Sequence, residues 1–330
     1  MKKILFLLLI PVFLMMSCGS DSNFDVDLTG VETPQIHIKR YGKAMFAIPP
    51  DSFLTAVPRL KDEFPLFLDG DLSDTNALLQ LKSFFVDRYM IELNDLVQKK
   101  FPDLTGLEKD LSLAFRHLKY YFPQFETPEF YSYISGLDLK FPVKYASGIV
   151  LISLDMYLGD NTEVYKVSGF PKYRTHWAVP QAIVPDVMKE IASGLMEEKK
   201  SNANLLENMV YLGKLAYFTK CMIPSVADTI LFKYTKSQME WVKDYEPNIW
   251  SFVLENQLLY DNDKRMIRKF TEDGPFTDYF SKKSPPRIAE YVGWCIVKKY
   301  MDETGAGLDK LLTETNAQKI LKLSRYKPKL

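Results

Sequence analysis

The chain has 330 residues, of which 47% are hydrophobic, and its 42 basic side chains balance 42 acidic ones. This length and composition allow a large apolar core, and the absence of net positive charge gives no electrostatic reason to expect a nucleic acid as partner. The 22 Phe, 19 Tyr and 4 Trp residues suit a densely packed interior.

The N-terminus has the pattern of a lipoprotein signal peptide. Lys2 and Lys3 precede an apolar run over residues 4–16, and Ser17 and Cys18 close it. The run is too short to span a bilayer about 30 Å thick as a stable helix. We therefore predict that residues 1–17 are removed and that Cys18 is acylated. The alternatives are an uncleaved N-terminal anchor, or a plain secretory signal in which Cys18 is incidental.

Polar and acidic residues after the cysteine predict a flexible tether over residues 18–30, followed by a single globular domain over residues 31–330. Removing the first 17 residues removes two lysines, which leaves 40 basic and 42 acidic side chains, a formal charge of −2. No other segment has 18 uninterrupted apolar residues, so the lipid is the one membrane attachment that the sequence predicts. Gly19 and Ser20 favour an outer-membrane lipoprotein facing the periplasm.

Three short segments predict strands. Polar and apolar residues alternate over residues 35–38, and Pro49 and Pro50 stop any continuation. Residues 130–134 and 148–154 are rich in β-branched and aromatic side chains. Because residues 148–154 are apolar almost throughout, we expect a strand that is covered on both faces.

Helical spacing of apolar residues dominates the rest of the chain. The first helix is expected over residues 76–100, and the second from Thr105, with Glu108 completing a capping box, to just before Pro123. Later helices are expected over residues 181–198, 204–220, 237–260 with an interruption at Pro247, 284–302 and 308–323. The predicted fold class is therefore mainly α (α+β), a helical bundle-like domain with a small β-sheet.

The helix over residues 284–302 carries the best candidate for a partner-binding site. Its start is predicted at Ser284 and Pro285, a capping residue followed by a proline at the first helical position. Gly293 in its interior predicts close approach of another backbone element. We expect Arg287 at the surface, with Tyr291 and Trp294 as an aromatic recognition surface. Trp241 and Trp250 form a second aromatic pair, and core packing is the ordinary role for all four aromatic residues.

Known catalytic patterns are missing from the sequence. His37, His117 and His176 are too far apart for a His-Glu-x-x-His motif, and there is no serine nucleophile elbow, phosphate loop, Cys-x-x-Cys pair or glycine-rich dinucleotide turn. Asp186 and Glu190 share one helix face, which permits a carboxylate pair, although acidic residues near a helix start also complement its dipole. No metal or other cofactor is therefore predicted.

Two cysteines remain after Cys18. Cys221 and Cys295 each lie in an apolar helical run. Buried free thiols are favoured over a disulfide between them, although an oxidising envelope would permit the bridge.

Motifs in a consistent order extend along the whole chain. They are the N-terminal segment through Cys18, Ile36–Tyr41 with Phe46, Phe64–Phe67, Leu154–Gly159, Ile183–Asp186, Gly213–Phe218 with Pro224, Trp241, Ile249–Trp250, Asp273–Phe276, Ser284–Ile288, Gly293–Trp294 and Ile296–Val297. Together they resemble the gliding motility lipoprotein GldB family. The resemblance implies an envelope lipoprotein needed for gliding motility and the associated type IX secretion machinery, as a component or assembly factor.

That family is in turn similar in layout to zinc-dependent gluzincin peptidases. The similarity implies that residues 148–154 form the substrate-aligning edge strand and that the helix at residues 185–189 replaces the metal-binding helix. Leu212 stands where a third ligand, a glutamate, would be. Zinc hydrolysis needs three protein donors and a base, and these positions do not supply them. The resemblance therefore implies a pseudo-peptidase.

Three functions follow from these patterns. The first is a non-enzymatic lipoprotein that binds envelope proteins of the motility and secretion machinery. The second is a hydrolase that uses carboxylates on the same scaffold. The third is a peptide- or ligand-binding lipoprotein, in which an extended peptide pairs with the strand over residues 148–154.

Overall fold

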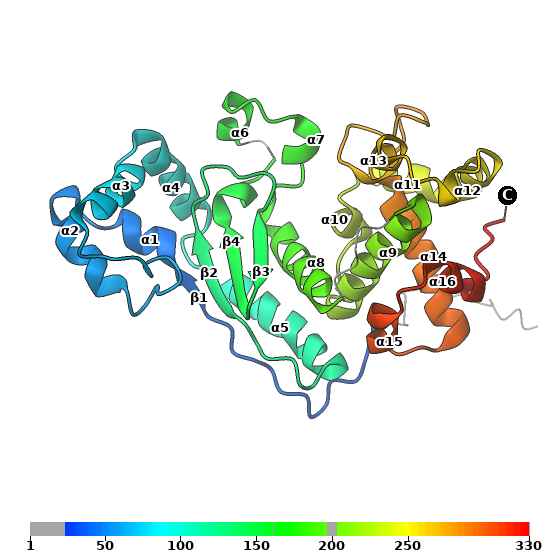
Figure 1. The fold of residues 1–330 in the computed structure, drawn as a ribbon, viewed down its shortest axis with the longest axis horizontal. Helices are drawn as coiled ribbons and strands as arrows, with labels where there is room; N and C mark the ends of the chain where they lie inside the picture. The colour runs from blue at the N-terminus through cyan, green and yellow to red at the C-terminus, as the bar shows by residue number, and fades with distance from the viewer. Residues whose placement is uncertain (1–23, 161, 197–202, 330) are drawn as a thin grey trace, which may run out of the picture.

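A small mixed sheet lies near the middle of the molecule, between two groups of helices (Figure 1). The structure, a computed structural model, describes residues 24–160, 162–196 and 203–329. The sheet has the order β1-β2-β4-β3, in which β1, β2 and β4 are parallel and β3 is antiparallel to β4. Its strands are β1 (Ile38–Arg40), β2 (Glu129–Tyr133), β3 (Val143–Ala146) and β4 (Ile149–Ser153).

Strand β4 has the expected burial but not the expected position. Val150 and Ile152 face the larger core, whereas Ile149 and Leu151 pack against a second core on the other side of the sheet. The alternation follows from the two-residue period of a strand, and it confirms that both faces are covered. However, β4 pairs with β2 on one side and with β3 on the other. The prediction of a substrate-aligning edge strand here is therefore wrong.

The smaller core is aromatic and lies between the sheet and the N-terminal helices. The ring of Tyr41 stacks on that of Phe67 with centroids 3.9 Å apart, and Phe85 and Tyr131 belong to the same core. The helices before β2 are α1 (Tyr41–Phe46), α2 (Phe53–Ala56), α3 (Thr75–Phe85), α4 (Arg88–Lys100) and α5 (Thr105–Tyr121), with short 3-10 helices at Pro50–Ser52 and Val57–Leu60. The smaller core takes its α-helical residues from α1, α2 and α3, whereas α4 and α5 bury theirs in the larger core.

Local capping explains two differences from the predicted helices. The single helix expected over residues 76–100 is broken, because the Asp87 carboxylate accepts the Met90 amide and starts α4 anew. Helix α5 begins at Thr105 as predicted and ends before Pro123, but Leu104 occupies its cap position. The predicted capping box is wrong, since the Glu108 carboxylate accepts the amide of Ile38 instead.

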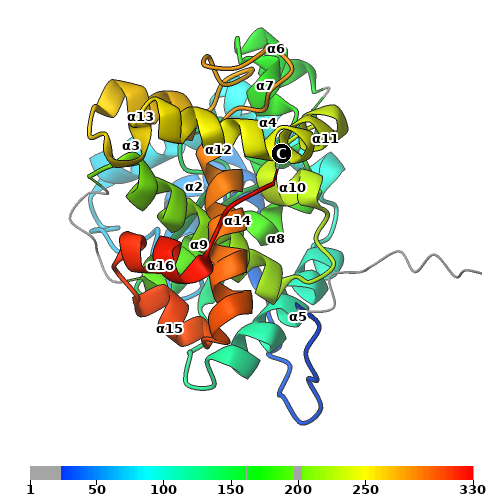
Figure 2. The same ribbon diagram turned by 90° about the vertical axis from the view of Figure 1, so that its right-hand side faces the viewer.

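The larger core is built from the C-terminal helices, helices α4 and α5, and one face of the sheet. Figure 2 shows the C-terminal helices from the side. These helices are α6 (Glu163–Val167), α7 (Lys172–Thr175), α8 (Ile183–Leu195), α9 (Leu205–Met222), α10 (Asp228–Phe232), α11 (Lys236–Asp244), α12 (Glu246–Glu255), α13 (Lys264–Thr271), α14 (Ile288–Thr304), α15 (Leu308–Thr313) and α16 (Ala317–Ser324). Short 3-10 helices lie at Leu154–Tyr157, Pro180–Ala182 and Leu258–Tyr260.

Helices α9 and α14 pack with their backbones in contact. A Cβ atom on Gly293 would lie 1.7 Å from the carbonyl oxygen of Met209, and one on Gly213 would lie 2.2 Å from the carbonyl carbon of Gly293. Real side chains do not reach such distances, so both positions require glycine. The close approach predicted from Gly293 is confirmed.

The start of α14 differs from the prediction. The helix begins at Ile288, and Arg287 before it has a left-handed backbone with φ 49°. Ser284 does not cap the helix, because its hydroxyl accepts the amide of Thr277. The hydroxyl of Thr277 in turn donates to the carbonyl of Pro285, so these residues close the loop before the helix.

The chain before β1 is fastened along α5. Arg116 donates to the carbonyls of Leu28 and Val31, while Ser112 and Glu108 accept the amides of Ile36 and Ile38. These three side chains follow a four-residue spacing and therefore share one helix face. We call residues 24–38 the N-terminal strap.

Phe24 begins the strap and is 1% exposed. In the described part of the tether predicted over residues 18–30, the side chain of Phe24 is buried and the carbonyl of Leu28 accepts from Arg116. Residues 18–23, including Cys18, lie outside the described residues, as does the predicted signal peptide.

Candidate functional site

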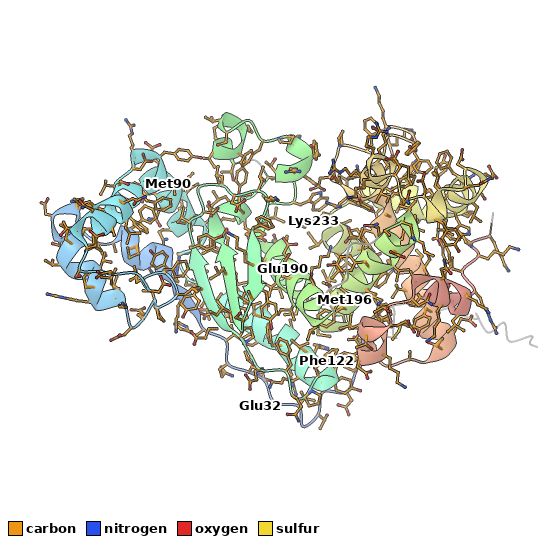
Figure 3. All side chains as sticks on the ribbon, viewed as in Figure 1. Glu32, Met90, Phe122, Glu190, Met196 and Lys233 are labelled. Atoms are coloured by element: carbon orange, nitrogen blue, oxygen red, sulfur yellow. The ribbon has the colours of Figure 1, made fainter. Side chains whose placement is uncertain are left out.

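A cluster of charged side chains lies where α8, the end of α10 and the start of α14 meet. Figure 3 labels two of its residues, Glu190 and Lys233, in the region between the sheet and the C-terminal helices. Helix α8 is the helix that the resemblance equated with the metal-binding helix of gluzincins, so its polar residues are the first candidates for chemistry.

Asp186 is buried in this cluster and is fully engaged. Its Oδ1 lies 2.8 Å from Nζ of Lys233, and its Oδ2 accepts the hydroxyl of Tyr157 at 2.9 Å. Burial, together with the neighbouring carboxylate, raises the pKa of Tyr157 well above its ordinary value, which keeps the phenol protonated as a donor. A carboxylate held by an ammonium and a phenol is an orienting group rather than an open base.

Lys189, Glu290 and Arg287 form the second half of the cluster. Lys189 Nζ lies 2.6 Å from Glu290 Oε1 and also donates to the carbonyl of Leu231. The guanidinium of Arg287 donates to the carbonyl of Phe232 at 2.6 Å, pairs with Asp273 and lies 3.5 Å from Glu290 Oε2. These ion pairs join α8, the end of α10, the loop that carries Asp273, and α14.

The predicted surface position of Arg287 is wrong. Its side chain is 16% exposed. Burial lowers the pKa of the guanidinium, but Asp273 and Glu290 outweigh burial and leave the pKa raised. The arginine cannot meet a partner unless it first leaves three protein groups. The prediction failed because the sequence pattern shows neither the later start of the helix at Ile288 nor the loop from which Asp273 pairs with the arginine.

Two residues of the cluster have left-handed backbones, Lys233 with φ 53° and Arg287 with φ 49°. A side chain other than glycine is strained in this conformation, at a cost of order 1 kcal/mol for each residue. The ion pairs of both side chains offset that cost, so the charge pairs keep the two residues in this backbone conformation.

Glu190 is the exposed member of α8 in this region. It follows Asp186 by one helical turn, as predicted. Partial loss of hydration and the nearby Asp186 charge raise the pKa of the Glu190 carboxyl above its ordinary range. The predicted carboxylate pair thus has one member bound to lysine and tyrosine and one that faces solvent.

Asp155, from the motif Leu154–Gly159, has a structural role. It is fully buried and accepts the amides of Ser135 and Leu137 at 3.0 and 2.8 Å. Burial raises the pKa of its carboxyl, against these hydrogen bonds. The residue fixes the turn after β2 to the segment after β4.

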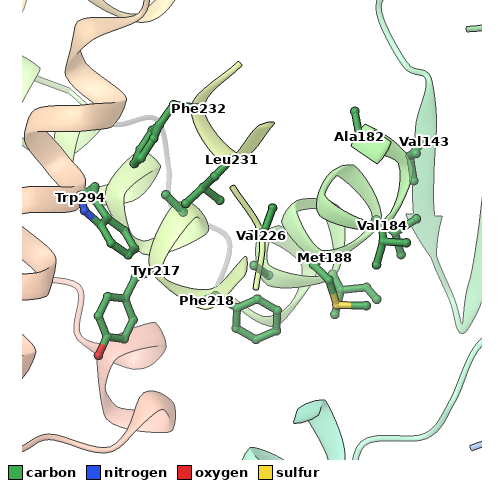
Figure 4. Close-up of a cluster of buried hydrophobic side chains, with 14 of the residues drawn as sticks. Val143, Ala182, Val184, Met188, Tyr217, Phe218, Val226, Leu231, Phe232 and Trp294 are labelled. Atoms are coloured by element: carbon green, nitrogen blue, oxygen red, sulfur yellow. The ribbon is translucent and has the colours of Figure 1, made fainter. Parts of the chain in front are cut away.

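The predicted aromatic residues belong mostly to the core. Tyr291 is 5% exposed and Trp294 is 8% exposed. The Tyr291 hydroxyl donates to Glu246 at 3.3 Å, and the Trp294 ring packs against Phe24 and Phe232. Figure 4 shows Trp294 at the edge of the buried cluster that extends across to β3.

Tyr291 and Trp294 nevertheless line one side of a hollow of about 410 Å³. Its rim is largely basic and consists of Lys243, Lys298, Lys299, Arg325 and Lys327. Arg287 does not line it. The structure therefore brings two of the three predicted partner-binding residues together and places the third elsewhere.

A larger groove was not predicted. It has a volume of about 940 Å³ and lies between α5, the start of α8 and the segment after α9. Apolar side chains make up most of its lining, among them Leu113, Ile183, Pro185, Ile223, Pro224 and Val226. Leu113 is 45% exposed. An apolar residue on the outer side of an otherwise amphipathic helix was the one sequence signal for this groove.

The remaining candidates stay apart. Cys221 and Cys295 are free thiols, as favoured from the sequence. His117 lines the groove, and its buried Nδ1 atom has no hydrogen-bond partner among the residues that the structure describes. Trp241 stacks on Tyr245, and Trp250 packs against Tyr326. Within the described residues, no group of three His, Cys, Asp or Glu side chains is arranged to hold a metal ion.

Comparison with known proteins gives a family. The family model for "Gliding motility protein GldB" matches residues 21–328. The chain belongs to the GldB family. The match covers nearly the whole chain and confirms the resemblance found from the sequence motifs. It also establishes an involvement in gliding motility at the level of the family.

No curated protein and no solved structure matches this GldB-family chain. The similarity to gluzincin peptidases therefore stays a prediction. The family model carries a lipoprotein label. None of the helices described here has the length and apolar character to cross a membrane.

Proposed function

We propose that this GldB-family protein is a non-enzymatic envelope lipoprotein that serves the gliding machinery, and the associated type IX secretion machinery, as an accessory or assembly component. In this proposal Cys18 carries the lipid, and the body faces the periplasm from the outer membrane. The family match supports the assignment to motility.

The observation that favours binding over catalysis is the closed charge cluster. Asp186 is bound by Lys233 and Tyr157, and Glu290 is bound by Lys189 and Arg287. General acid–base catalysis requires a group that can reach a substrate proton and release it. These carboxylates instead join α8, α10 and α14, which is a structural role.

The alternative functions have less support. Strand addition at residues 148–154 is not available, since β4 is paired on both sides. A hydrolase would have to use Glu190, the exposed carboxylate of α8, and a zinc hydrolase would retain metal. One zinc per purified chain, surviving dialysis against a weak chelator, would contradict the proposal.

Crosslinking in intact cells tests partner binding. A photoreactive amino acid at Lys298, on the rim of the hollow beside Trp294, and one at Tyr173 on α7 as the matched control would be compared by mass spectrometry. We expect envelope proteins crosslinked at Lys298 and not at Tyr173, in a strain whose gliding the variant still supports. The same photoreactive amino acid would also be placed at Leu113 in the groove. A protein that supports gliding but yields no crosslinked partner at Lys298 or at Leu113 would contradict a binding role.

A Cys18→Ala variant tests the lipid anchor in the same strain. We expect the variant to lose labelling by a fatty-acid analogue and to leave the membrane fraction. A variant that still labels and still sediments with membranes would show that the lipid is not on Cys18.

A further inference from the structure

The hollow beside Trp294 is formed by segments that are distant in the sequence. Helices α10, α11 and α14 and the start of α12 line it, together with the C-terminal tail, residues 325–328. Tyr326 fixes the tail there, because its hydroxyl donates to Glu246 at 2.9 Å and its ring packs edge-on against that of Trp250, with centroids 5.0 Å apart. Figure 2 shows the tail, in red, running from α16 past α14. The hollow therefore exists only in the folded chain.

Two carboxylates at the hollow are held by basic side chains of its rim. Asp228 Oδ2 lies 2.9 Å from Nζ of Lys243. The carboxylate of Glu303 lies 2.8 Å from Nζ of Lys299 and 3.4 Å from Nη1 of Arg325. An ammonium has three donors and a guanidinium has five, and each of these pairs uses one of them. The rim thus keeps hydrogen-bond donors for a ligand.

Glu246, the other carboxylate of the lining, accepts from two phenols. Tyr326 donates to its Oε1 at 2.9 Å, and Tyr291 donates to its Oε2 at 3.3 Å. Burial raises the pKa of both hydroxyls above its ordinary value, which keeps them protonated as donors. Five basic side chains line the hollow against two carboxylates, and both carboxylates already have partners in the protein. The ligand that such a lining favours is an anion.

The rest of the lining is largely aromatic and apolar. Phe232, Met239, Tyr291 and Trp294 contribute to it, and the rings of Phe232 and Trp294 lie 5.9 Å apart between centroids (Figure 4). Trp and Tyr are the residue types most enriched at the centres of protein-binding sites. A small inorganic anion would leave these side chains uncovered, whereas a peptide that carries both carboxylates and apolar side chains would contact rim and rings together. The volume of about 410 Å³ suits a short segment of chain.

We propose that this hollow binds an acidic segment of an envelope partner protein, whose carboxylates pair with Lys298 and Lys299 while an apolar side chain packs on Trp294. The inference rests on the proposed binding role and deepens it, because it names the surface and the chemistry of the partner. Complementary charge of this kind speeds association and rejects basic partners. Because exposed ion pairs are individually weak, several of them must act together, with the apolar contact beside them.

Crosslinking from the tail tests the surface and the partner together. The full chain, with a photoreactive amino acid at Lys327, would be produced in cells that need it for gliding, and crosslinked peptides would be mapped by mass spectrometry. We expect a partner segment rich in Asp and Glu. Lys298→Glu with Lys299→Glu should lower the crosslinking yield at least tenfold. Lys282→Glu with Lys283→Glu, the same charge change at an exposed pair outside the hollow, should leave the yield unchanged.

A neutral variant keeps the test decisive if the glutamate variant does not fold. Lys298→Gln with Lys299→Gln removes both charges without placing new carboxylates beside Glu303, and should lower the yield about threefold. The abundance of each variant in the membrane fraction separates lost binding from lost protein. At equal abundance, a yield from the glutamine variant that matches the unaltered protein would overturn the proposal.

The other failures have distinct results. Crosslinked partners at Leu113 in the groove, with none at Lys327, would leave the binding role intact and contradict this surface. Crosslinks from Lys327 to lipid, or to a partner segment without acidic residues, would contradict the acidic partner. If cells glide but no partner is crosslinked at Lys298, Leu113 or Lys327, the binding role itself is wrong and the inference falls with it.

Discussion

Gly213 and Gly293 set the distance between α9 and α14. The backbones of the two helices touch where neither residue has a side chain. Both helices also carry the rings that enclose Phe24, Tyr217 on α9 and Trp294 on α14. A change in their separation would therefore affect the core and the attachment of the strap together.

We expect Gly293→Ala to destabilise the protein by about 3 kcal/mol, the upper part of the usual range for overpacking, since the added carbon would overlap the Met209 carbonyl. Gly106→Ala on α5 is the matched control, because a Cβ there meets nothing within 4 Å. It should be neutral, or stabilising by up to about 1 kcal/mol. Chemical unfolding of both variants measures the difference, and equal stability would contradict the close packing.

Arg287 is expected to behave as a buried structural charge. Arg287→Ala leaves Glu290 and Asp273 without their guanidinium partner and should cost about 3 kcal/mol in unfolding free energy. Arg265→Ala, at a side chain 91% exposed, should change it by no more than about 0.5 kcal/mol. Thermal unfolding of both variants checks this. A stable Arg287→Ala protein that had lost only gliding would restore the arginine as a partner-binding residue.

Glu190 predicts a specific pH dependence. Because its carboxyl pKa is raised in the folded protein above the ordinary 4.5, its favourable contribution is present below about pH 4.5 and is lost as the pH rises through the folded value. The melting temperature of Glu190→Gln, relative to that of the unaltered protein, should therefore be higher at pH 7 than at pH 4. Melting temperatures at both pH values measure it, with Glu255→Gln on α12 as the control. A difference in melting temperature between the two proteins that is the same at pH 4 and at pH 7 would contradict the raised pKa.

At the scale of elements, α5 supports the strap on one face and the groove on another. Arg116→Ala removes two charged hydrogen bonds to Leu28 and Val31, each worth about 1.5 kcal/mol or more. We expect amide hydrogen exchange over residues 24–31 to speed up at least tenfold, with smaller changes elsewhere. Lys119→Ala on the same helix is the control. Equal exchange in the two variants would mean that Arg116 does not fasten the strap.

The helices themselves were largely predictable, because apolar spacing reports which segments bury one face. Breaks within them were less so. Asp87 divides the first predicted helix by capping α4, and the segment over residues 308–323 contains two helices because Asn316 caps α16 anew. In each case a single polar side chain overrides a continuous apolar pattern. Strand β3 was missed since its four residues alternate too briefly to stand out.

The candidate site could be predicted only in part. Gly293 signalled close packing because glycine inside a helix has a specific cost, and Asp186 with Glu190 followed from helical spacing. The partners of Asp186 and Arg287 did not, since Lys233 follows Asp186 by 47 residues and Asp273 pairs with Arg287 from a separate loop. Arg287 and Lys233 also have left-handed backbones, a conformation that neither residue type indicates.

At the scale of the whole molecule, two cores share one sheet, and the closed charge cluster joins the C-terminal helices of the larger core. The strap runs from this core along α5 to the sheet. The hollow and the groove thus lie outside the charge cluster, which agrees with the proposed accessory role.

The most direct test of this account replaces the Asp186–Lys233 pair in a strain that depends on the protein for gliding. The double variant Asp186→Asn, Lys233→Met keeps the size of both side chains and removes both charges, so neither is left unpaired. Gliding speed would be measured at matched protein abundance in the membrane fraction. A structural cluster predicts that gliding is retained. A folded, membrane-bound double variant without gliding would contradict it and would return α8 to the list of candidate active sites.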